Sequence, residues 1–134
     1  MYKIFIRFTI QGDTLDIHEI LDDIPIKADV FIKGEPVITK FNNGNKTQKT
    51  NRWVYSIESQ GDGVNSVMQR MKKELCSHKD KIRDYTKKHF SLLDIVIYEN
   101  SDKPLTKFNI SLSKTNLKFI ADLNTKVSLS IFDW

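Results

Sequence analysis

Chemistry of the nucleophilic or metal-binding kind would have to come from one cysteine and three histidines. Cys76 is the only cysteine of the 134-residue chain, and His78 follows it two positions later. A thiol nucleophile needs a base within hydrogen-bond reach, but side chains two apart on a helix do not face each other. The spacing of His18, His78 and His89 matches no zinc motif. We therefore predict neither a catalytic thiol nor a metal site, and the sequence assigns Cys76, His78 and His89 no role beyond packing.

Acid–base chemistry and phosphate binding have equally little support. Asp22 and Asp23 form the clearest carboxylate pair, but they follow a short predicted helix, where we expect solvated loop charges rather than a buried acid. Glycines such as Gly34 and Gly61 suit turns, and none begins a Walker or dinucleotide-binding fingerprint. Without a nucleophile–base pair, a metal spacing or a cofactor loop, we predict that the chain is not an enzyme and uses no cofactor.

The basic residues that could bind a partner lie in a polar stretch of the first half. Lys40, Lys46 and Lys49 stand there among few apolar side chains, and Arg52 follows. Mobile loops on a rigid sheet commonly carry binding residues. We therefore predict that Ile38–Asn51 is a long surface loop and that Lys40, Lys46, Lys49 and Arg52 bind a partner.

A second group of basic residues lies on the stretch Val64–His89. At about 100° per residue its lysines spread over about half of a helix circumference, and acidic residues are mixed among them, as on a solvated face. A nucleic-acid binder concentrates its basic excess more than a net charge of +4 and exposes aromatic residues between the charges. Tyr85 and Phe90 are instead expected in the core. We rank a nucleic-acid partner below a protein partner.

Hydrophobic periodicity supplies the scaffold for these residues. Val64–His89 places its apolar residues at steps of three, four and seven, the pattern of one long amphipathic helix. Alternating apolar residues predict strands at Tyr2–Ile10, Ile26–Ile32, Arg52–Ile57, Leu93–Tyr98, Leu105–Leu112 and Val127–Phe132. Short helices are predicted at Leu15–Leu21 and Asn116–Leu123, the second capped by Ser113 or Thr115. The sequence thus predicts an α+β fold: a single sheet of about six strands, one long helix and two short helices, in the order βαββαββαβ.

The two ends of the chain share a pattern. Four apolar positions recur at the same spacing, each set in the order strand, short helix, strand: Ile10, Leu15, Ile17 and Leu21, then Leu112, Leu117, Phe119 and Leu123. The pattern fits a pseudo-duplicated β-α-β unit, and it fits equally well two unrelated units of similar size. The sequence leaves both open.

Length and composition define the broad class. The chain has 134 residues, with 40% hydrophobic and 28% charged residues, which fits one globular domain over residues 1–134. No apolar run approaches the roughly 20 residues that cross a bilayer. The N-terminal Met1–Arg7 has charges inside its apolar run, which indicates a strand rather than a signal peptide. A single cysteine fits a reducing compartment. We expect a soluble cytoplasmic protein without a membrane partner; its oligomeric state stays open.

Several short motifs occur in an order that is found in a known family. They are Phe8-x-Ile10-x-Gly12-Asp13, Leu21-Asp22-Asp23-Ile24-Pro25, Lys33-Gly34-Glu35, Trp53 and Ile110-x-Leu112-Ser113-x-x-x-Leu117-x-x-Ile120-Ala121-x-Leu123. In their order and spacing the chain resembles the bacterial domain-of-unknown-function family 4279 over nearly its whole length. It departs from the family pattern at Asp23, where a glycine is expected, and in the long stretch before Trp53. The resemblance implies an α+β fold with a single sheet and supplies no catalytic residues.

The resemblance also gives a functional expectation. Some members of this family are similar in context to immunity proteins of bacterial toxin systems. Together with the small size and the lack of catalytic motifs, this leads us to expect a non-catalytic cytosolic binding protein, an immunity protein whose partner is a cognate toxin domain. The alternative is a nucleic-acid-associated protein that uses the basic loop and the helix lysines.

Overall fold

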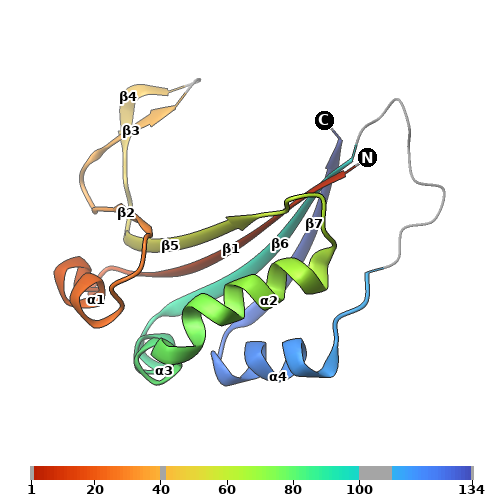
Figure 1. Cartoon of the computed structure of the whole chain (residues 1–134). Helices are drawn as coiled ribbons and strands as arrows, with labels where there is room; N and C mark the ends of the chain where they lie inside the picture. Colours follow the sequence, from red (N-terminus) through yellow and green to blue (C-terminus); the bar gives the residue numbers. More distant parts are fainter. Residues whose placement is uncertain (1, 40–41, 100–109, 134) are drawn as a thin grey trace.

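The computed structural model describes residues 2–39, 42–99 and 110–133 (Figure 1). Its strands are β1 (Tyr2–Gly12), β2 (Asp29–Phe31), β3 (Pro36–Thr39), β4 (Asn42–Thr47), β5 (Asn51–Glu58), β6 (Phe90–Glu99) and β7 (Lys126–Asp133). Its helices are α1 (Ile17–Asp23), α2 (Val64–Leu75), α3 (Lys79–Lys88) and α4 (Lys114–Asp122), with one 3-10 turn, η1 (Cys76–His78), between α2 and α3. The main sheet has the strand order β2-β5-β1-β6-β7, and β3 and β4 form a separate hairpin.

β1 is the central strand of the main sheet and pairs antiparallel with both β5 and β6. β7 pairs parallel with β6, because α4 carries the chain back between them, and β2 pairs antiparallel with β5. The predicted α+β class is confirmed, although the main sheet has five strands where about six were expected. The strands on either side of α1 and α4 differ in their sheet positions: β6 and β7, around α4, are neighbours, whereas β5 lies between β1 and β2, around α1.

Helices α2, α3 and α4 lie on one side of the sheet (Figure 1). The strand side chains that point to this side form the core, and Ile6 and Phe8 of β1 are 0% exposed. Phe8 packs edge-on against Trp53 of β5, with ring centroids 6.0 Å apart. The alternation of side chains along a strand explains why one parity of β1 is apolar and buried. We call this side the covered face.

The long helix predicted over Val64–His89 is present from Val64 to Lys88, with η1 as one tighter turn inside it. Its apolar stripe is buried as predicted, since Met71, Leu75 and Ile82 are all 0% exposed. Ser113 caps the N-terminus of α4, and its hydroxyl accepts a hydrogen bond from the Asn116 backbone N–H, so the first of the two predicted caps is confirmed. No helix among the described residues is long and apolar enough to cross a membrane.

Two predicted segments differ from the structure. The prediction of a loop over Ile38–Asn51 is wrong, because this stretch contains part of β3, all of β4 and the first residue of β5. β4 reads NNGNKT and contains no apolar residue, so its pairing with β3 leaves no apolar alternation in the sequence pattern. The predicted strand Leu105–Leu112 lies mostly outside the described residues, and its described part, Ile110–Leu112, is not in a strand.

Candidate functional site

The second side of the main sheet carries none of the described helices (Figure 1). We call it the open face. Because side chains alternate along a strand, β1 turns Arg7 to this face, and the register places it beside Ser56 of β5 and Asp94 of β6. A hollow of about 520 Å³ lies on this face, and it is lined by Arg7, Thr9, Gln11, Asp29, Phe31, Arg52, Val54, Ser56, Phe90, Leu92 and Asp94.

Neighbouring strands hold the charged groups around this hollow in place. The Arg52 guanidinium lies 4.4 Å from the centre of the Phe31 ring, a cation–π geometry that joins β5 to β2. On the opposite side, the Ser128 hydroxyl donates a hydrogen bond of 2.6 Å to the Asp94 carboxylate. Lys126 places its Nζ atom 5.6 Å from the centre of the Phe90 ring. The open face therefore presents charges that are positioned before any partner arrives.

Lys46, Lys49 and Arg52, the described residues of the predicted binding set, line one hollow of about 700 Å³ beside the hairpin. The fourth predicted residue, Lys40, lies outside the described residues. Two backbone hydrogen bonds close the base of the hairpin. The Gln48 N–H donates to the Glu35 carbonyl oxygen at 2.8 Å, and the Gly34 N–H donates to the Gln48 carbonyl oxygen at 2.9 Å. Arg52 lines this hollow and the hollow of the open face, so the two hollows adjoin at this side chain.

Phe90 and Tyr85 were both predicted to lie in the core. The prediction is wrong for Phe90, whose side chain is 47% exposed, and confirmed for Tyr85, which is buried. The long helix ends at Lys88, and Phe90 opens β6 on the parity that faces away from the helices.

Sequence reasoning also missed Arg7 and Asp94 of the open face, although the sequence pattern could have indicated them. Both alternate with the apolar residues of predicted strands, so they point to the side of the sheet opposite the core, and a single layer of helices leaves that side uncovered.

The family assignment rests on the whole chain. The model of the family DUF4279, a domain of unknown function, matches residues 2–134. The chain belongs to the DUF4279 family. This confirms the resemblance found in the sequence motifs, and the family description attaches no activity to the fold. No curated protein and no solved structure is significantly similar to the chain.

This DUF4279 domain has another groove, of about 470 Å³, lined by residues of α1 and α3. The Tyr85 hydroxyl donates a hydrogen bond to the Asp23 carboxylate there. The prediction that Asp22 and Asp23 lie in a loop is wrong, because both belong to the end of α1; Asp22 is exposed and Asp23 is partly buried. Burial and the bond to Asp23 raise the pKa of Tyr85 above its usual value, so the phenol stays protonated at neutral pH. The contact ties α1 to α3 and leaves no phenolate nucleophile.

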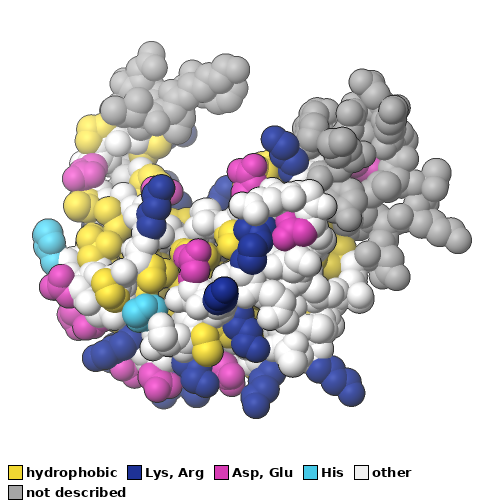
Figure 2. Space-filling view, viewed as in Figure 1, with side chains coloured by type: hydrophobic (Ala, Val, Ile, Leu, Met, Phe, Trp, Pro, Cys, Tyr) yellow, Lys and Arg dark blue, Asp and Glu magenta, His cyan; other side chains and the backbone are white. Residues whose placement is uncertain are grey.

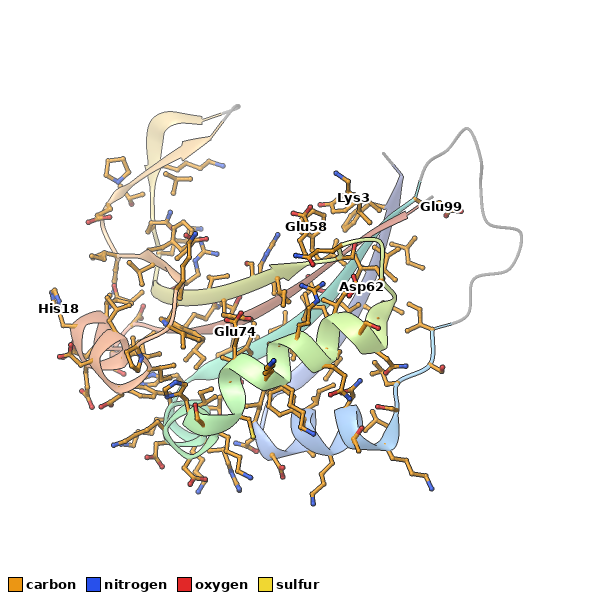
Figure 3. The ribbon with its side chains drawn as sticks, viewed as in Figure 1. Lys3, His18, Glu58, Asp62, Glu74 and Glu99 are labelled. Atoms are coloured by element: carbon orange, nitrogen blue, oxygen red, sulfur yellow. The ribbon has the colours of Figure 1, made fainter. Side chains whose placement is uncertain are left out.

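Neither the cysteine nor any of the three histidines lines the hollow of the open face. Cys76 is exposed in η1, and His18 projects outward from α1 (Figure 3). His89 stacks on Tyr85 with ring centroids 6.5 Å apart. Within the described part of the chain, no three His, Cys, Asp or Glu side chains are placed to hold a metal ion.

The helix lysines also fit a solvated surface rather than a site. Figure 2 shows Lys and Arg side chains of the helical side interspersed with Asp and Glu. Lys72 and Lys73 stand in the last turn of α2, where positive charge also stabilises the helix end. Lys72 and Lys73 therefore have a structural role that requires no binding partner.

Proposed function

We propose that this DUF4279 protein is a non-catalytic binding protein that holds a protein partner on its open face and hairpin. The observation that carries the proposal is the position of Arg52, which lines both hollows. Through this residue a rigid sheet face with charged and aromatic groups continues into a basic hairpin. The surface is therefore extended, as a protein partner that covers about 800 Å² would require.

The chemistry of the open face favours a protein over a uniform polyanion. Arg7 and Arg52 stand among the carboxylates of Asp29 and Asp94 on the same face. Arginine and aromatic residues are enriched at the centre of protein interfaces, and the half-exposed Phe90 ring offers such an anchor. A mixed pattern of charges also gives register and specificity, because a wrong partner would bring like charges together.

The arrangement of the ionisable groups supports a non-catalytic role. Asp94 accepts a hydrogen bond from Ser128, and Arg52 is held over Phe31. Catalysis by these groups would need a nucleophile with a base in reach, or an acid with a raised pKa. The described residues that line the open-face hollow include no cysteine, histidine or tyrosine. Binding remains the simplest use of such a surface.

The finer form of the proposal is an immunity protein that neutralises a cognate bacterial toxin in the cytoplasm. It rests on the family resemblance and on a small scaffold with an extended binding surface. The net charge of +4 adds a condition. Immunity proteins that cover the basic active site of a nuclease tend to be acidic, because charge complementarity speeds association. The toxin of this protein should therefore present an acidic surface, or be bound away from its catalytic site.

A nucleic-acid-associated role is the second candidate, and the basic hollow favours it. Lys46, Lys49 and Arg52 gather around one concave surface, where a phosphate backbone could release its counterions. The acidic residues Asp29 and Asp94 on the adjoining open face oppose an extended nucleic-acid path. A protein partner therefore fits the whole surface better.

Co-expression with the product of the neighbouring gene tests the proposal. If that product is a toxin domain, we expect growth to be restored and a complex to co-purify, with its mass measured by light scattering. A matched column of immobilised DNA or RNA tests the alternative: retention that falls steeply with salt would support nucleic-acid binding. Persistent toxicity without a complex would contradict the immunity role, and turnover abolished by one conservative change in either hollow would contradict the non-catalytic role.

A further inference from the structure

The two edges of the main sheet differ in a way that the proposed function does not explain. One edge is β2, which has only three residues, Asp29–Phe31. The other is β7, which has eight residues and pairs only with β6 among the described strands. Folded proteins protect long edge strands with charges, prolines or bulges, because unpaired backbone groups attract another strand. The segment Val127–Phe132 of β7 reads VSLSIF and contains none of these devices.

On the covered face, the apolar side chains of β7 are exposed, whereas those of its neighbour β6 are buried. Val127, Leu129 and Ile131 are 45%, 51% and 50% exposed. The register pairs them with Leu93, Ile95 and Ile97 of β6, which are at most 2% exposed. Thus the apolar layer of the covered face continues onto β7 and stops at an edge that no other described strand pairs with. Four of the seven large exposed hydrophobic side chains among the described residues belong to this strand: Val127, Leu129, Ile131 and Phe132.

We propose that β7 pairs antiparallel with β7 of a second copy of this chain, which joins the two five-stranded sheets into one continuous sheet. The two-fold axis passes through Leu129. Val127 then lies opposite Ile131 of the second copy, and Leu129 lies opposite its own equivalent. Such cross-strand pairs have Cβ atoms about 5 Å apart, so the three apolar residues of each copy cover one another.

The sequence of β7 selects this register. On the open face, the same axis places Ser128 opposite Ser130 and Lys126 opposite Phe132, whose side chain is half-exposed. A shift of the axis by one residue along the strand leaves either Val127 or Ile131 without an apolar partner. A register that pairs residues of opposite parity would set covered-face side chains against open-face ones. The self-complementary pattern therefore identifies a second copy, rather than an unrelated strand, as the occupant.

This inference does not rest on the proposed function, because Leu129 points to the covered face and the partner surface is on the open face. The first test is the mass of the parent chain in solution, measured by sedimentation across a dilution series. We expect a concentration-dependent species of twice 15.6 kDa. Leu129→Lys should raise the dissociation constant of this species by about tenfold or more, because like charges then oppose each other at the axis.

Cysteine cross-linking tests the register with a more conservative change. In a Cys76→Ser background, Leu129→Cys should form a disulfide-linked dimer, because Cα atoms across such a pair lie within disulfide range. Val127→Cys is the matched control: it lies on the same strand and face with similar exposure. Its equivalent lies about 13 Å away along the strand, too far for a disulfide. A parent chain that stays monomeric, a dimer that Leu129→Lys leaves unchanged, or equal cross-linking of both cysteine variants would overturn the proposal.

Discussion

Phe5 and Phe8 stand three residues apart on β1, yet they belong to two different surfaces. Phe8 is 0% exposed on the covered face and packs edge-on against Trp53. Phe5 is partly exposed on the open face and packs edge-on against Tyr98, with ring centroids 5.5 Å apart. The same residue type with the same ring geometry thus belongs to the core on one side of the sheet and to the open face on the other. The parity of a residue on its strand decides which.

The largest expected effect tests this difference directly. Phe8→Ala should lower the free energy of unfolding by about 3–5 kcal/mol, because it leaves a cavity in a fully buried layer. Phe5→Ala should cost about 1 kcal/mol, as substitutions outside the core usually do. Urea unfolding monitored by circular dichroism gives both values. Equal losses for the two variants would show that the open face is as much a core as the covered face.

The helix layer should behave as the covered face does. Leu75→Ala removes a 0% exposed side chain from the apolar stripe of α2, and we expect a loss of about 2–5 kcal/mol. Lys73→Ala on the exposed side of the same helix is the control, with an expected change within about 0.5 kcal/mol. Thermal melts of the two variants provide the measurement. A small loss at Leu75 would mean that α2 contributes little to the core.

The contact between Tyr85 and Asp23 should have an intermediate effect that depends on pH. Tyr85→Phe removes the donated hydrogen bond and should cost about 1 kcal/mol near neutral pH. Burial and the bond to Asp23 raise the pKa of Tyr85 in the folded chain, so its contribution is complete below the unfolded value of about 10. It is lost as the pH rises above about 10. Urea unfolding should therefore show a smaller alkaline loss for Tyr85→Phe than for the parent, and parallel losses would contradict this.

The covered face could be predicted well from the sequence because its rules are local. Alternation in β1 and the stripe of α2 identify buried residues such as Ile6 and Met71. The hairpin β3–β4 could not be predicted, because β4 has no apolar residue and β3 is only four residues long. The shared position of Arg52 in two hollows depends on the sheet order β2-β5-β1, which is a property of pairing between distant segments. The sequence therefore showed that the hairpin region is basic, but it could not show that this region lies beside Arg7 and Asp94 in the folded chain.

The smallest expected effect on stability is on the hairpin. Lys46→Ala combined with Lys49→Ala should change the free energy of unfolding by less than about 0.5 kcal/mol, because both side chains are exposed. The addition of Arg52→Ala should bring the total to about 1 kcal/mol, since its guanidinium packs over Phe31. Partner binding should weaken in both variants, mainly through slower association measured by stopped flow. If the triple variant associates as fast as the parent, the hairpin is only a connection.

The affinity for the partner, measured by titration calorimetry with two matched double variants, tests the central claim most directly. Arg7→Ala with Arg52→Ala removes two cations from the open face, and Lys73→Ala with Lys81→Ala removes two exposed cations from the helical side. If the open face is the binding surface, the arginine variant should bind at least about tenfold more weakly and the lysine variant as tightly as the parent. A loss confined to the lysine variant, with full affinity in the arginine variant, would contradict the account and place the partner on the helices.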